Sequence, residues 1–171
     1  MHLSNLFYSN NINGIQVTAS LLFGDKLKCI KGIELLSDLY DTSVTAINSY
    51  ITIIQSPEYC EMFQTRCACP LQPYEGDFFS ENSVAEWTAA DIVFANSTCF
   101  NSELMDQIAQ HAIKMRHGSR LITFTRPLPS DSFRITEKLN LGMSWGAATC
   151  YIHLRYLFSL LFPDFMIFLV H

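Results

Sequence analysis

Three short stretches place acidic or amide side chains directly after apolar, strand-like runs. Glu34 closes the run CIKGIE, Asp77 follows Gly76 after LQPYE, and Asn96 follows DIVFA. A carboxylate accepts hydrogen bonds from hydroxyl or amine groups, and a primary amide both donates and accepts them. If these runs are parallel strands, the three side chains lie at the carboxyl edge of one sheet, where α/β proteins bind ligands. The sequence therefore predicts a ligand site at that edge.

Each of these residues also has a purely structural interpretation. Glu34 could accept two hydrogen bonds from ribose hydroxyls, or it could be a solvated acid at the start of a helix. Asp77 could accept a hydrogen bond from an exocyclic amine such as that of adenine, or it could be a turn residue, because Gly-Asp is common in turns. Phe78 or Phe79 could stack on a base, or each could pack in the core.

The stretch NSTCF, residues 96–100, combines polar side chains with an aromatic ring. Asn96 could orient a nucleophilic amine beside an electrophilic methyl group, and Phe100 could wall an apolar channel that desolvates the amine. The alternative is a plain loop that leads into a helix capped by Asn101 or Ser102. The residue types alone leave both interpretations open.

The hydrophobic periodicity predicts the elements that position these residues. We expect helices over residues 14–23, 35–54, 83–90 and 101–116. We expect strands over residues 29–34, 71–75, 91–95 and 120–125. Such alternation favours a mostly parallel α/β sheet. The runs MSW and ATCYIHL, separated only by Gly146 and Ala147, predict an antiparallel hairpin at its end.

The composition suits one globular domain with a buried core. The chain has 171 residues, of which 49% are hydrophobic and 16% charged. With a net charge of -5 and no run of Lys and Arg, it shows no direct nucleic-acid site. The segment 156–171 is almost entirely apolar, but it is too short for a membrane span and contains Pro163 and Asp164. We expect a hydrophobic tail rather than an anchor.

The six cysteines do not have the dense, regular spacing of a secreted disulfide framework. Cys60, Cys67 and Cys69 form a cluster, but it lacks a CxxC pair and a nearby His. We therefore expect free thiols rather than a zinc site, and no metal. Because no signal peptide is recognisable, we expect an intracellular, reducing compartment.

Five blocks occur in the order in which a known family carries them. They are GIELL with Glu34, EGDFF with Asp77, DIVFANSTCF, KMRHGSRLITFTRPL and MSWGAATCYIHLR. Together they resemble the non-SET histone lysine methyltransferases, the disruptor-of-telomeric-silencing family, over about residues 14–155. The resemblance implies a Rossmann-like class I methyltransferase fold, S-adenosylmethionine as methyl donor and a nuclear location. It also implies transfer to the ε-amine of a lysine in a histone, a core lysine of histone three in this family.

The resemblance also implies a role for individual residues. Those expected to bind the donor are Gly14, Glu34, Gly76, Asp77, Phe78 and Asn96. Those expected in the catalytic motif are Asn96, Ser97 and Phe100. Those expected to wall the lysine channel are Thr98, Trp145 and Tyr151.

The N-terminal part departs from the family pattern. The place of the Gly-rich donor loop reads NNINGI, of which only Gly14 is left, and only Leu6 to Tyr8 are available for a first strand. We therefore expect the first strand and the Gly-rich loop to be missing or degraded in an N-terminally truncated chain. The expected organisation is an irregular N-terminus over 1–13, a methyltransferase-like domain over 14–155 and a hydrophobic tail over 156–171.

Two other functions stay open at this point. One is a catalytically impaired remnant of the fold that acts as an interaction module. The other is a different Rossmann nucleotide-binding enzyme, such as an oxidoreductase, which the missing Gly-rich fingerprint disfavours.

Overall fold

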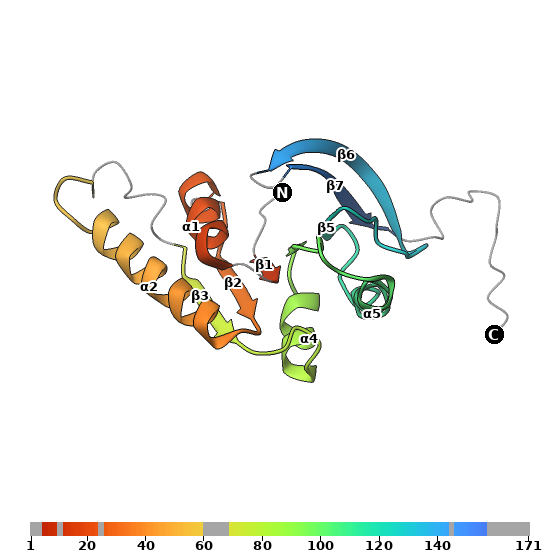
Figure 1. Cartoon of the computed structure of the whole chain (residues 1–171), viewed down its shortest axis with the longest axis horizontal. Coiled ribbons are helices and arrows are strands. Elements are labelled where there is room, and N and C mark those ends of the chain that lie inside the picture. The colour runs from red at the N-terminus through yellow and green to blue at the C-terminus, as the bar shows by residue number, and fades with distance from the viewer. Residues whose placement is uncertain (1–4, 10–11, 24–25, 60–68, 144–145, 157–171) are drawn as a thin grey trace, which may run out of the picture.

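The computed structural model of the protein describes residues 5–9, 12–23, 26–59, 69–143 and 146–156, with the backbone alone for residues 5–9 and 12–15. Strands and helices alternate along most of this length (Figure 1). In chain order they are β1 (Asn5–Ser9), α1 (Ile12–Phe23), β2 (Cys29–Glu34), α2 (Ser37–Ile54), β3 (Leu71–Glu75), α4 (Glu81–Thr88), β4 (Ile92–Ala95), α5 (Ser102–Ala112), β5 (Arg120–Phe124), β6 (Phe133–Met143) and β7 (Gly146–Arg155).

The strands form one seven-stranded sheet in the order β3-β2-β1-β4-β5-β7-β6. Neighbouring strands from β3 to β5 are parallel, whereas β7 is antiparallel to both β5 and β6. This arrangement confirms the predicted parallel sheet that ends in an antiparallel hairpin. Figure 1 shows α1 and α2 beside β2 and β3, and α4 and α5 on the other side of the sheet.

The main core lies between the sheet and the pair α4 and α5. Trp87 of α4, Ile108 of α5 and Leu121 of β5 are fully buried there. The buried residues of α5, Met105, Ile108, Ala109 and Ala112, follow the i, i+3, i+4, i+7 pattern and so form one stripe along the helix. This packing fixes the positions of the strands that carry the predicted site.

The helix α5 begins as the sequence predicts. Asn101 is its N-cap, and the side-chain Oδ1 of this residue accepts a 2.9 Å hydrogen bond from the backbone N of Leu104. The helix ends at Ala112, short of the predicted end at Arg116. Gly118 follows in the left-handed region, with φ 87°, and donates its backbone N–H to the oxygen of Arg155.

A first strand is present, contrary to the prediction that it is missing or degraded. β1 lies at the centre of the sheet, where it pairs in parallel with β2 and with β4. The prediction that residues 1–13 are irregular is therefore wrong for the segment 5–9. The Asn and Ser residues that surround the short apolar run LFY concealed this strand in the sequence.

The closing hairpin is longer than the sequence predicts. β6 begins at Phe133 rather than at MSW, and Gly146 and Ala147 belong to β7 rather than to the turn. The turn residues 144–145 lie outside the described residues. The segments 60–68 and 157–171, which contain Cys60, Cys67 and most of the expected tail, lie outside them as well.

Candidate functional site

The carboxyl ends of β2, β1 and β4 lie side by side at one edge of the sheet. Ser9, the last residue of β1, is in register with Ile33 of β2 on one side and with Ala95 of β4 on the other. Glu34 and Asn96 therefore lie one residue beyond these positions, on either side of the end of β1. With neighbouring strands about 4.8 Å apart, their backbones are separated by about 10 Å. The strand order reverses between β1 and β4, the place where open α/β sheets bind ligands.

Glu34 is buried at this edge, with 3% of its surface exposed. Its side-chain Oε1 accepts a 3.1 Å hydrogen bond from the backbone N of Leu36, the N-cap residue of α2. Its backbone oxygen accepts a 2.9 Å hydrogen bond from the N of Gly76, so the ends of β2 and β3 are joined. The interpretation of Glu34 as a solvated acid is therefore wrong. The carboxylate is held at the edge by the backbone around it.

Gly76 and Asp77 continue from the end of β3. Gly76 borders a hollow of about 330 Å³, whose lining also includes Ile33, Tyr74, Glu75, Ser80, Asn82, Ser83 and Glu86. A Cβ added at Gly76 would meet nothing within 4 Å, so there is open space at this position. Asp77 is exposed, and its Oδ1 accepts a 2.8 Å hydrogen bond from the backbone N of Phe79. This bond forms the predicted turn.

Phe78 packs in the core rather than at the edge of the sheet. Its ring stacks on Trp87 with centroids 4.8 Å apart and an interplanar angle of 7°. The backbone oxygen of Phe78 also accepts a 3.1 Å hydrogen bond from the indole N–H of Trp87. The structural interpretation of this ring is the one the structure supports. The ring is 7% exposed and Trp87 covers one of its two faces, so it offers little surface to a base, and the expected role of Phe78 in donor binding stays a prediction.

The loop after β4 is fastened to β5 by Ser97. The hydroxyl of Ser97 donates a 2.9 Å hydrogen bond to the backbone oxygen of Phe124 and accepts a 2.8 Å hydrogen bond from its N. The residue is 0% exposed. A side chain that is fully buried and bonded in both directions is out of reach of a substrate. Ser97 is therefore a positioning residue, and its expected place in a catalytic motif requires this correction.

The other residues of this loop lie nearer the surface. Asn96 is partly buried, and its Oδ1 accepts a 3.2 Å hydrogen bond from the hydroxyl of Thr98. This bond turns the carbonyl of the amide toward Thr98 and leaves the NH₂ group to act as a donor elsewhere. Phe100 is partly buried and packs against the core beneath α5. The loop thus places one amide and one aromatic wall beside the end of β4.

Tyr151 lies two strands away from this loop. It is in register with Thr123 of β5, on the face of the sheet that carries Leu121 and α5. Its ring is partly buried, and the Nζ of Lys138 lies 5.6 Å from its centroid. Tyr151 and Phe100 are therefore on the same side of the sheet. Trp145, the other residue expected in the channel wall from the hairpin, lies outside the described residues.

Gly14 is the third residue of α1 and not part of a loop. The connection from β1 to α1 consists of residues 10–11, which lie outside the described residues. The prediction that Gly14 belongs to the remnant of a Gly-rich loop is therefore wrong, because Gly14 lies in the helix that follows the loop. As a residue of the first turn, Gly14 lies where backbone N–H groups have no partner within the helix and can bind an anion.

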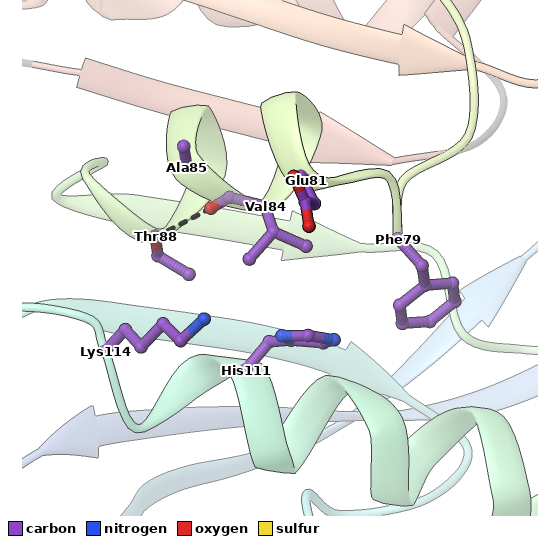
Figure 2. Close-up of a pocket in the computed structure, with 7 residues that line it drawn as sticks. All are labelled: Phe79, Glu81, Val84, Ala85, Thr88, His111 and Lys114. Atoms are coloured by element: carbon purple, nitrogen blue, oxygen red, sulfur yellow. Dashed lines mark hydrogen bonds between the residues drawn. The ribbon is translucent and has the colours of Figure 1, made fainter.

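A second hollow, of about 450 Å³, lies between α4 and the end of α5. Figure 2 shows Val84 and Ala85 of α4 on one side and His111 and Lys114 on the other, with Phe79 at one end. The dashed bond is the one that the hydroxyl of Thr88 donates to the oxygen of Val84, at 2.7 Å. Of the residues considered for the site, Phe79, the alternative to Phe78 as a stacking ring, is the one that lines this hollow. It is a groove on the flank of the domain, away from the carboxyl edge of the sheet.

Burial shifts the pKa of three cysteine thiols and of one histidine ring. It raises the pKa of the Cys29 and Cys150 thiols, and it raises the pKa of Cys69 to about 11. These thiols stay protonated at neutral pH and are poor nucleophiles. Burial also lowers the pKa of His153, which is 0% exposed. Within the described part of the chain, no group of His, Cys, Asp and Glu residues is placed to hold a metal ion.

Thr125 is a feature of the site that the sequence does not reveal. It follows β5 directly after Phe124, the residue that Ser97 holds, and it has φ 67°. A β-branched residue rarely adopts this left-handed conformation. Its backbone N–H donates a 2.7 Å hydrogen bond to the oxygen of Thr149 in β7. No sequence signal marks the position, because a residue in this conformation is usually Gly or Asn.

The family is established by comparison with known proteins. The sequence matches the family described as histone methylation protein DOT1 over residues 15–143. The chain belongs to this family. The match confirms the resemblance drawn from the sequence blocks. No curated protein sequence matches the chain at a significant level.

Solved structures that resemble this member of the DOT1 family show the same fold. The rRNA methyltransferase AviRa from Streptomyces viridochromogenes has a TM-score of 0.61 at 11% identity, with 90% of this chain and 76% of that chain covered. The O-methyltransferase from Bacillus cereus in complex with SAH has a TM-score of 0.57 at 11% identity, with 88% and 73% covered. At such low identity these structures establish the class I methyltransferase fold alone.

The described helices offer no candidate for a membrane span. None of them is both long enough and apolar enough to cross a bilayer.

Proposed function

We propose that this DOT1-family chain transfers a methyl group from S-adenosylmethionine to the ε-amine of a lysine in a histone, a core lysine of histone three. The observation that carries the proposal is the position of Glu34 and Asn96, which flank the end of β1 at the reversal of strand order. A carboxylate on one side and an amide on the other suit a ligand with a polar nucleoside end and a reactive methyl end. The proposed site of action is the nucleus.

The residues present fit the donor. Glu34 would accept hydrogen bonds from the two ribose hydroxyls, since its carboxylate is already held at the sheet edge by the backbone N of Leu36. The open space beside Gly76 would admit the adenine end, where Asp77 can accept a hydrogen bond from an exocyclic amine. When bound, S-adenosylmethionine supplies a sulfonium-bound methyl group that a nucleophile can attack.

The chain itself contributes positioning and desolvation. The Oδ1 of Asn96, which can accept a second hydrogen bond beside the one from Thr98, would accept one from an N–H of the substrate amine and leave the lone pair of that amine free to attack. Phe100 and Tyr151, on the same side of the sheet, would exclude water from that amine, with Thr98 at the loop surface. The amine must be neutral to attack, so its proton leaves to water before the transfer. Ser97 serves the reaction indirectly, because it fixes the loop to β5.

A methyl-transfer assay tests the proposal. The full chain is incubated with tritium-labelled S-adenosylmethionine and reconstituted nucleosomes, and the labelled histone and residue are identified by mass spectrometry. We expect label on a lysine of histone three, and a rate reduced about a hundredfold in Asn96→Ala. Cys99→Ser is the matched control, because Cys99 is an exposed neighbour in the same loop. Label on RNA but on no histone would contradict the substrate that we propose.

The second candidate function is a non-catalytic interaction module. It is favoured by the position of Gly14 within α1, because the described residues provide no glycine loop for the donor. In that case the chain would bind histones without transferring label to them. Histone binding measured together with an absence of labelled product would select this function over the first.

A further inference from the structure

One face of the closing part of the sheet is apolar apart from Glu137, which is in register with Ile152, and has no helix over it among the described residues (Figure 1). It is built by strand residues alone, with Phe124, Ala148 and Cys150 buried at its centre and Phe94, Ile122, Met143 and Ile152 partly buried around them. We call these seven residues, together with Leu139 and Leu141, the closing face. In the register of β6 and β7, Leu139 is opposite Cys150 and Leu141 is opposite Ala148. Both leucines therefore point to this face.

The closing face is open to solvent at its outer side. Leu139 is 42% exposed and Leu141 is 38% exposed, although both lie beside buried neighbours. The helix α1 covers the same side of the sheet at Ile30 of β2 through Ala19, at the other end of the molecule. Figure 1 shows α1 and α2 near β2 and β3, and no helix along the outer side of β6 and β7. A contiguous apolar surface of this kind is usually covered by another segment or a partner.

The chain itself contains a segment of matching chemistry. Apart from Ser159, Pro163, Asp164 and His171, every residue over 157–171 is apolar. This segment lies outside the described residues, and it begins where β7, one of the strands of the closing face, has just ended. The starting point is well fixed: the hydroxyl of Tyr156 donates a 2.8 Å hydrogen bond to the oxygen of Asp131, and Arg155 donates to the oxygen of Ser132.

The length of this segment is sufficient to reach the whole closing face. An extended chain spans at most about 3.5 Å per residue, so residues 157–171 can reach about 50 Å. The ten residues of β7 rise only about 33 Å. A segment attached to the end of β7 has a high effective concentration at the face beside it, which favours it over a free partner.

From these observations we propose that residues 157–171 fold back and pack on the closing face, against Leu139 and Leu141. The segment would then take the place of a covering helix on this side of the sheet. This proposal does not depend on the proposed enzymatic function, because the closing face and the donor edge are separate surfaces.

Limited proteolysis of the full chain tests the proposal. Chymotrypsin cleaves after Phe and Leu, which are abundant in residues 157–171. The release of this segment is followed by intact mass. We expect slow release from the unaltered chain and release about tenfold faster from Leu139→Lys, because cleavage follows the fraction of undocked segment. If Leu139→Lys does not unfold cooperatively and is therefore not properly folded, Leu141→Lys is the second variant.

The matched control is Ile135→Lys in the same strand. Ile135 is 49% exposed, but it is in register with His153 and therefore points to the opposite face. We expect it to leave the release rate unchanged. Equal release rates in the unaltered chain, Leu139→Lys and Ile135→Lys would overturn the proposal. If the protection of residues 157–171 from chymotrypsin grows with protein concentration, a second copy of the chain binds the segment, and the proposal is overturned. If the protection requires phosphatidylcholine vesicles, the segment binds a lipid surface, and the proposal is overturned as well.

Discussion

The hydroxyl of Ser97 joins the loop after β4 to the backbone of β5 through two hydrogen bonds to Phe124. Because the same loop carries Asn96, the position of the amide depends on this contact. A Ser at the carboxyl end of a strand has the residue type of a nucleophile, and its burial shows that it has a different task. At the residue scale, the site therefore consists of a few groups that face the ligand and of others that hold them in place.

Replacement of Ser97 by Ala should lower the free energy of unfolding by about 1–3 kcal/mol, since the buried N–H of Phe124 loses its partner and the C=O of Phe124 keeps only the bond from the N of Arg126. Urea denaturation measures the change. Ser102→Ala is the matched control, because Ser102 is an exposed Ser in the first turn of α5. An effect of Ser97→Ala no larger than that of Ser102→Ala would show that the contact does not hold the loop.

Substitution of Gly76 by Ala should weaken donor binding at least about tenfold without changing stability. The added methyl group meets no protein atom within 4 Å, so it can only obstruct a ligand that approaches the backbone. Gly142→Ala is a clean control: Gly142 has equally open space and lies in β6, away from the donor edge. Donor affinity measured by competition with labelled donor should fall for the first variant only. An unchanged affinity for Gly76→Ala would place the donor elsewhere.

Individual site residues were predictable where a strand pattern preceded them. Glu34, Asp77 and Asn96 lie at the carboxyl edge, as expected, because the apolar runs before them are parallel strands. The burial of Ser97 and the stacking of Phe78 on Trp87 were not predictable, since both contacts join segments far apart in the chain. The sequence around such a Ser or Phe is the same whether its side chain faces a ligand or the core.

The closing hairpin shows at the element scale why one strand was concealed in the sequence. Most of β6 is exposed, as expected of an edge strand, and carries charged residues that discourage pairing with another chain. Its register also shifts between Ile135 and Glu137, so the alternation of apolar and polar residues is interrupted there. The alternation of apolar and polar residues that marks a strand in a sequence cannot be recognised across such a bulge. The buried strands β2, β4 and β5, by contrast, have apolar runs that predict them well.

The connection after β5 contains a strained position that can be relieved. Thr125→Gly should raise the melting temperature by about 2–6 °C, because a left-handed β-branched residue costs on the order of 1–3 kcal/mol and the greater freedom of Gly in the unfolded chain offsets only part of it. Thermal unfolding monitored by circular dichroism is the measurement. Thr125→Ala should give a smaller gain, since Ala keeps Cβ. A melting temperature lower than that of the unaltered chain would show that the Thr125 side chain stabilises this connection.

At the scale of the whole molecule, the buried side chain of His153 connects three segments of the fold. Nε2 of His153 accepts a 3.0 Å hydrogen bond from the backbone N of Leu128, while Nδ1 lies 2.9 Å from the oxygen of Leu121. Both contacts are satisfied only by the neutral ring with its proton on Nδ1. The ring joins β7, β5 and the connection that leads to β6. The apolar residues around His153 predict a strand. The two hydrogen-bond partners of its ring cannot be predicted from the sequence, because the tertiary fold brings them together.

Stability should therefore decrease as the pH falls below about 6.5, the ordinary pKa of His. Burial lowers the folded-state pKa of His153, so below 6.5 the unfolded state binds more protons than the folded state and gains stability from them. Urea denaturation at pH 7.5 and pH 5.5 measures the loss. His153→Gln should show a smaller difference between the two pH values, although it is less stable at both. A pH dependence of equal size in this variant would assign the effect to other groups.

The most direct test of donor binding at the carboxyl edge is a calorimetric titration of the full chain with S-adenosylmethionine, beside the variant Glu34→Gln. We predict a saturable one-site heat for the unaltered chain and an affinity about ten- to a hundredfold lower for Glu34→Gln, since one charged acceptor of the ribose hydroxyls becomes neutral. Circular dichroism confirms that the variant is folded. No heat at millimolar donor, or equal affinities for the two proteins, would contradict the account.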